Sequence, residues 1–173
     1  MTDPQGRWER AAVASLVTAG AVLLAAGCAS STPAAHSQAA QGVPAAGKTP
    51  AARYLAIALP ANRQLDHEFD GLKDHENSNL AAAQGDLRAA AATERRFDRQ
   101  LMAITFPPRT EPIVRLLYRV NQARAALTST AAGAMSLGQL RGYQRRLDAA
   151  NAPVEDAVRV IRSQLGLPPP DTS

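Results

Sequence analysis

Beyond residue 49, apolar side chains recur at alternating steps of three and four residues along most of the chain. Because an α-helix turns once in 3.6 residues, this spacing predicts helices with one apolar face. Thr49 followed by Pro50 is a typical helix start, and the first helix should end near residues 75–79, with Ser78 capping the next. The first stripe is Leu55, Ala58, Asn62, Leu65, Phe69 and Leu72.

The same spacing predicts a second helix that ends before Pro107 and Pro108, since two prolines cannot continue a helix. Its stripe is Leu80, Ala83, Leu87, Ala90, Glu94, Phe97, Leu101 and Ile104. Thr110 should then cap a third helix. The stripe of that helix is Ile113, Leu117, Val120, Leu127 and Ala131.

A fourth helix should begin after Ser136, which forms a capping box with Gln139. Gly166 should end it in the left-handed conformation, and the three prolines that follow prevent continuation. Its stripe is Leu137, Leu140, Leu147, Val154, Val158, Ile161 and Leu165.

Four amphipathic helices of similar length, with short breaks and no strand pattern, predict an all-α, up-down-up-down four-helix bundle over residues 49–167. Residues 168–173 should form a disordered tail. The alternative is a three-helix fold with residues 50–104 continuous. Such a helix would be ~80 Å long at 1.5 Å per residue, more than a domain of this size could cover.

Polar residues gather at one predicted level of the bundle, where Pro60 and Pro153 also fall. The four are Asn62, Glu94, Asn121 and Asn151. A buried glutamate needs a partner, which Arg124 or Arg95 could supply. The layer is either a small polar pocket for a ligand or a buried network that fixes helix register. In a third interpretation Glu94 leans out to solvent.

Residues 66–76 carry five acids, two histidines and one lysine. On a helix, His67, Asp70 and Asp74 share a face with His75 nearby, so these four are weak candidates for a divalent metal site. Their spacing fits no known metal cage, and a solvated acidic helix end explains them as well. We therefore predict no metal and no other cofactor.

Charge and composition exclude several classes of protein. A net charge of +4 with 4% aromatic residues falls short of a nucleic-acid binder, so no nucleic acid is expected as a partner. Residues 88–124 hold eight arginines, but interspersed acids make them typical of exposed helix faces. No catalytic motif with a serine, cysteine or metal-binding histidine pair is visible, and we predict that the chain is not an enzyme.

The only cysteine, Cys28, follows an uncharged run over residues 11–27 that ends in Ala25, Ala26 and Gly27. A single cysteine cannot form an internal disulfide. The run is long enough for the apolar core of a signal peptide, and Arg7 and Arg10 precede it.

This N-terminal segment resembles the signal peptide and lipobox of bacterial lipoproteins, although Ala25 stands where leucine is commonest. The resemblance covers residues 1–28 and implies cleavage before Cys28, whose thiol receives a diacylglycerol. Residues 1–27 would be the signal peptide and residues 28–48 the lipidated cysteine and a flexible tether rich in Ala, Ser, Gly, Pro and Gln. The alternative is an ordinary secretory signal with a chance cysteine.

We therefore expect a lipoprotein on the extracytoplasmic face of the cell membrane, bound to the membrane through Cys28. The excess of arginine over lysine and the abundance of alanine resemble proteins of high-GC genomes such as those of actinobacteria. The first functional hypothesis is a structural or protein-interaction module with a protein partner in the cell envelope. The alternative is a binding protein for a small polar ligand or a metal.

Replacing Cys28 by alanine should release the protein from membranes, because two acyl chains hold a protein far more firmly than one or none. Membrane flotation of cells that express each form measures this, with Ser30→Ala as the matched control. Equal flotation of Cys28→Ala and the parent chain would contradict the lipoprotein resemblance.

Overall fold

The structure, a computed structural model, describes residues 49–170 of the chain. Within that range it has four α-helices and no strand: α1 (Pro50–His75), α2 (Leu80–Met102), α3 (Glu111–Ala131) and α4 (Leu137–Gln164). The all-helical prediction is confirmed. The alternative of one helix through residues 50–104 is wrong, because a turn over residues 76–79 separates α1 from α2.

Side-chain caps fix the starts of three helices. The backbone N–H groups of Ala52, Ala82 and Gln139 donate to the side chains of Thr49, Asn79 and Ser136, each at 3.1 Å. Each cap satisfies one of the free N–H groups in the first turn of its helix.

Two of the predicted caps need correction. Asn79, not Ser78, caps α2, because Asn79 directly precedes the helix in an extended conformation (φ −137°, ψ 92°) and its side chain accepts from the first turn. The Ser78 hydroxyl instead donates to the Asp74 carbonyl at 3.5 Å. Thr110 does occupy the N-cap position of α3 but makes no side-chain cap bond there, since its own backbone is already helical (φ −92°, ψ −25°).

The end of α4 is the one the sequence predicts. Gly166 has a φ of +69°, a value that suits glycine because it lacks a Cβ. The N–H of Leu167 donates to the Arg162 carbonyl at 2.9 Å and that of Gly166 to the Ser163 carbonyl at 3.1 Å. This pair of bonds is a Schellman motif, which satisfies the last carbonyls of the helix.

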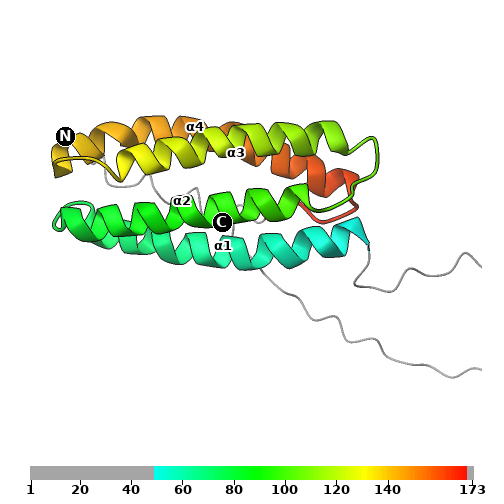
Figure 1. Cartoon of the computed structure of the whole chain (residues 1–173), viewed down its shortest axis with the longest axis horizontal. Coiled ribbons are helices and arrows are strands. Elements are labelled where there is room, and N and C mark those ends of the chain that lie inside the picture. The colour runs from blue at the N-terminus through cyan, green and yellow to red at the C-terminus, as the bar shows by residue number, and fades with distance from the viewer. Residues whose placement is uncertain (1–48, 171–173) are drawn as a thin grey trace, which may run out of the picture.

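The helices pack in sequential order: α1 against α2, α2 against α3, and α3 against α4. Figure 1 shows the α1–α2 and α3–α4 turns at one end, and the α2–α3 connection at the other. The backbones of α1 and α4 make no comparably close approach. The interface between α1 and α4 is therefore formed by side chains, without close packing of the two helix backbones.

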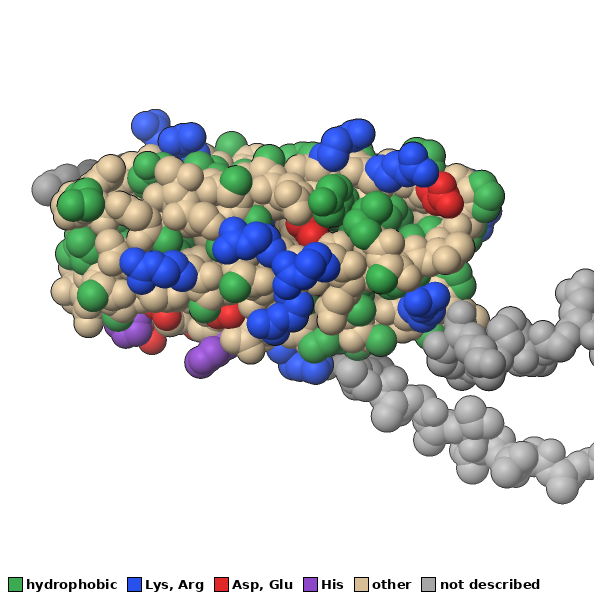
Figure 2. All heavy atoms as spheres, viewed as in Figure 1, with side chains coloured by type: hydrophobic (Ala, Val, Ile, Leu, Met, Phe, Trp, Pro, Cys, Tyr) green, Lys and Arg blue, Asp and Glu red, His purple; other side chains and the backbone are tan. Residues whose placement is uncertain are grey.

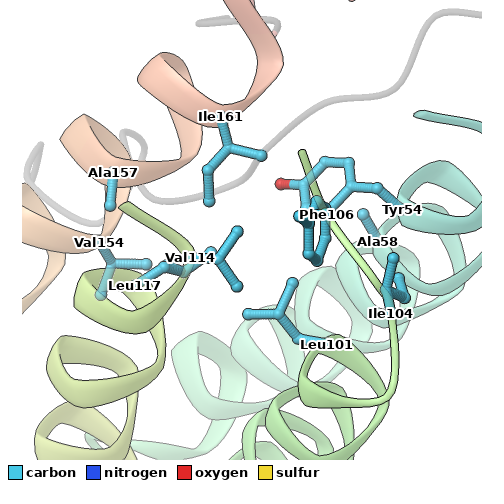
Figure 3. Close-up of a cluster of buried hydrophobic side chains, with 10 residues drawn as sticks. All are labelled: Tyr54, Ala58, Leu101, Ile104, Phe106, Val114, Leu117, Val154, Ala157 and Ile161. Carbon is cyan, nitrogen blue, oxygen red and sulfur yellow. The ribbon is translucent and has the colours of Figure 1, made fainter. Parts of the chain in front are cut away.

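The core consists of two apolar clusters. The first lies by the α2–α3 connection, where side chains from all four helices converge with Phe106 (Figure 3). The second lies towards the two turns and includes Leu72, Leu87, Leu140 and Leu147. Between them the helices bury polar side chains instead. These are Glu68, Thr93, Glu94, Asp98, Asn121 and Thr128.

The predicted apolar stripes are confirmed for α2 and shifted in part of the other helices. In α3, Asn121 is buried (2% exposed) and Val120 is only partly buried. In α1 and α4 the buried positions include Tyr54 and Ala157, one residue before the predicted Leu55 and Val158. Neighbouring residues point 100° apart around a helix axis. A difference of one residue is therefore enough to move a side chain from the core to the edge of the buried face.

Among residues 49–170, no helix combines the length and the apolar run needed to cross a bilayer. The predicted signal peptide, the tether and Cys28 lie outside the described residues, as do the last three residues of the predicted tail.

Leu101 is fully buried in the first cluster, so Leu101→Ala should lower the free energy of unfolding by about 2–5 kcal/mol through lost burial and the cavity left behind. Leu116→Ala makes the same chemical change at an exposed position of α3 and should cost less than about 0.5 kcal/mol. Urea unfolding of both variants measures this. Equal losses would show that the clusters are wrongly assigned.

Candidate functional site

A cavity of about 70 Å³ lies between the helices at the level of the polar side chains. All four helices contribute to its wall. Its lining residues are Tyr54, Ala58, Asn62, Leu65, Asp66, Phe69, Glu94, Phe97, Leu117, Asn121, Arg124, Val154, Val158 and Arg162. Most of these come from α1 and α4, the pair that does not pack closely. The cavity is large enough to hold several water molecules or a compact ligand.

Glu94 is the most deeply buried charged residue of the cavity wall, with 1% of its surface exposed. Its Oε1 lies 2.9 Å from Nε of Arg124, whose side chain is 13% exposed. Burial raises the pKa of Glu94, because a carboxylate loses its hydration there, and the positive charge of Arg124 acts in the opposite direction.

A second carboxylate, Asp98, lies one helical turn along α2 from Glu94 and is fully buried, although it does not line the cavity. The side-chain amide of Asn121 donates to Asp98 Oδ1 at 2.8 Å and to the backbone carbonyl of Glu94 at 3.4 Å. Burial raises the pKa of Asp98 as well, and the Asn121 hydrogen bond and Arg124 oppose this. Two buried acids thus share one buried guanidinium.

Arg124 connects this pair to α4. Its Nη1 donates to Oδ1 of Asn151 at 3.1 Å. The chain of contacts therefore runs from Asp98 and Glu94 on α2, through Asn121 and Arg124 on α3, to Asn151 on α4. Side-chain polar contacts of this kind hold three helices in one register.

Several polar atoms in this group have no hydrogen-bond partner among the described residues. They are both carboxylate oxygens of Glu94, Oδ2 of Asp98 and Nε of Arg124. The Arg124–Glu94 contact is therefore a close ion pair without an aligned hydrogen bond. A buried acceptor that lacks a donor costs about 1–3 kcal/mol, and Oε2 of Glu94 is the acceptor among these that lies on the cavity wall without an ion-pair partner.

The structure brings the four polar residues singled out in the sequence to one level. Asn62, Glu94 and Asn121 line the cavity, and Asn151 contacts it through Arg124. The interpretation in which Glu94 leans out to solvent is wrong, since its side chain is buried. Pro60 and Pro153 are exposed, so neither proline ring forms part of the wall.

The sequence reading missed Asp98, although a signal for it existed. Asp98 lies four residues after Glu94 and three residues before Leu101, a spacing that places it on the buried face of α2. It also missed Glu68, which is buried on α1 and accepts hydrogen bonds from Thr93 Oγ1 and Gln64 Nε2, both at 2.9 Å. Both residues were missed because an acidic side chain next to an apolar stripe is usually expected to point to solvent at the edge of the stripe.

The structure does not assemble the four weak metal candidates. His75 Nδ1 lies 2.9 Å from Asp86 Oδ2 on α2, and Lys73 lies 3.4 Å from Asp70. Within residues 49–170, His, Asp and Glu side chains form no group of three or more that could hold a metal ion. Gly71 makes the contact with α2 possible, because a Cβ there would lie 3.0 Å from Asp86 Oδ1.

The arginines outside the cavity lie on the surface. Figure 2 shows basic side chains across the middle of the face formed by α2 and α3. Several bind neighbours on these helices: Arg95 donates to Ser129 at 2.7 Å, and Arg115 pairs with Glu111 at 3.2 Å. Exposed pairs of this kind contribute little to stability.

Comparison with protein-family models, with curated proteins and with solved structures finds no match to this chain. The candidate site therefore rests on the geometry of the cavity alone.

Removing Arg124 should be far more harmful than removing Glu94. Arg124→Leu leaves two buried carboxylates without their cation and should cost about 3–5 kcal/mol of unfolding free energy at neutral pH. Glu94→Leu leaves Asp98 to interact with Arg124, and it should therefore cost less than Arg124→Leu. Urea unfolding at neutral pH compares the two. A larger loss for Glu94→Leu would overturn this account of the charges.

Proposed function

We propose that this chain is a lipid-anchored extracytoplasmic protein whose helical part is an up-down-up-down four-helix bundle that binds a small polar ligand. The ligand site is the cavity lined by Asn62, Glu94 and Asn121. The sequence suggests either a protein-interaction module or a ligand-binding protein, and a specific structural observation favours ligand binding.

The observation is a buried carboxylate with one open oxygen on the wall of a cavity. Glu94 is 1% exposed, and its Oε1 is paired with Arg124, whereas its Oε2 has no hydrogen-bond partner among the described residues. Glu68 and Asp98 also keep a buried oxygen without a hydrogen-bond partner, but of these three acids only Glu94 lies on the cavity wall. An acceptor that remains open beside empty space is what a binding site requires.

Contacts at one end of the molecule support the bundle topology. Arg53 in the first turn of α1 donates to the carbonyl of Ala103, just after α2, at 3.3 Å. Arg109, before α3, donates to the carbonyl of Gln164 at the end of α4, at 3.2 Å. The beginning of α1 and the end of α4 thus both contact the α2–α3 connection, as antiparallel neighbours would require.

The membrane location rests on the sequence around Cys28, which places a lipid anchor before residue 49. The cavity would then face the envelope, where small polar solutes arrive from outside the cell. We also propose binding without catalysis, since the residues that line the cavity include no serine, cysteine or histidine.

The interaction-module hypothesis stays a prediction. The large exposed apolar side chains Met102, Leu116, Met135 and Val160 lie on different elements, and single exposed apolar residues are normal on a protein surface. Nothing in their positions favours a particular protein partner.

A ligand that binds only the folded state should raise the thermal midpoint, by ~2.7 kcal/mol of stability at a hundred times its dissociation constant. We expect at least one class of small polar compound to do so when the full-length chain, in detergent micelles, is screened with amines, amides, alcohols, carboxylates and sugars. Val158→Trp, which should fill the cavity from α4, is the control and should abolish the shift. No shift with any class would contradict the proposed function.

A further inference from the structure

The charges around the cavity specify which polar group it should accept. We infer that the ligand is a protonated amine on a compact apolar body, with its ammonium group held by the carboxylate of Glu94. This inference rests on the proposed function and deepens it by naming the class of ligand.

The first argument is that the cations on the cavity wall already have partners. Arg124 lies against Glu94 and donates to Asn151. Arg162, at the other side of the cavity, donates through Nε to the Pro168 carbonyl at 2.6 Å and through Nη2 to the Pro169 carbonyl at 3.5 Å. The arginines therefore offer few free donors to an anionic ligand.

The second argument is that one acceptor of the carboxylate remains open. Oε1 of Glu94 is paired with Arg124, but Oε2 has no hydrogen-bond partner among the described residues, and the amide of Asn121 is occupied by Asp98 and the Glu94 carbonyl. An ammonium group has three N–H donors and no acceptor, so it matches this deficit. An anion or a second acceptor would add to it.

The third argument concerns net charge. Glu94 and the neighbouring Asp98 are two buried acids beside Arg124, and Asp66 is a second carboxylate on the cavity wall. The other arginine of the wall, Arg162, is engaged with the carbonyls of Pro168 and Pro169. Burial and the neighbouring Asp70 raise the pKa of Asp66, and the positive charge of Lys73 acts in the opposite direction. A bound cation would interact favourably with both carboxylates of the wall.

The rest of the wall sets the shape of the ligand. Leu65, Phe69, Phe97, Val154 and Val158 form an apolar surface, and the cavity volume of about 70 Å³ suits a short alkyl or a small ring. Burying that body drives binding, while the charged contact sets its orientation. The aromatic rings also tolerate a cation close to their faces.

The test compares compounds that share one body and differ in one polar group. Butylamine, butanol and butyrate are titrated calorimetrically into the full-length chain in detergent micelles, with matching detergent blanks. We expect butylamine to bind at least about tenfold more tightly than butanol, as a charge-assisted hydrogen bond would give, and butyrate not to bind.

Glu94→Gln should weaken butylamine binding by about tenfold or more, since the amide removes the charge and keeps the shape. The matched control is Glu68→Gln, a buried acid on α1 that does not line the cavity, and it should leave the affinity unchanged. Should Glu94→Gln fail to fold, Val158→Trp replaces it and should abolish butylamine binding.

The outcomes separate this inference from the proposed function. Binding of butanol or butyrate in preference to butylamine would overturn the ligand class and leave the cavity as a binding site. Butylamine binding that survives Glu94→Gln as well as it survives Glu68→Gln would overturn the role of Glu94. If no compound of any class binds, both proposals fail.

Discussion

The ion pair between Glu94 and Arg124 is the constraint on which the middle of this molecule depends. Taking two charges out of water costs several kcal/mol, and their mutual attraction returns that free energy only when the geometry is good and the remaining polar atoms are satisfied. Here Asn151 on α4 accepts a hydrogen bond from Arg124, and Asn121 on α3 donates to Asp98 and to the backbone carbonyl of Glu94. The positions of three helices are therefore tied to one buried contact.

The polar layer also explains how the apolar core is divided. Side chains such as Leu101 and Leu117 form one cluster, and Leu87 and Leu147 belong to the other. Each cluster can pack without polar groups, because the charged side chains are gathered between them. The cavity lies where neither cluster fills the space, so it follows from the polar layer and not from poor packing.

Much of the helical architecture could be predicted from the sequence, because apolar periodicity, prolines and caps act locally. Pro50, Ser136 and Gly166 mark their helix ends as expected. The phase of α3 was harder to predict, because Asn121 and Val120 compete for the core and only the partner on α2 decides between them. The level of the polar residues was predictable from helical rise, whereas the open Oε2 of Glu94 depends on side-chain geometry that no spacing encodes.

The sequential packing of the helices has a mechanical consequence. In a closed ring of four helices, a solute can reach the centre only if one helix–helix interface breaks. Here α1 stays packed against α2, and α4 against α3, even when α1 and α4 separate. A solute would therefore reach the centre by the exchange of side-chain contacts between α1 and α4, among them those of Tyr54 and Ile161 in the first cluster, while the other helix–helix interfaces stay intact.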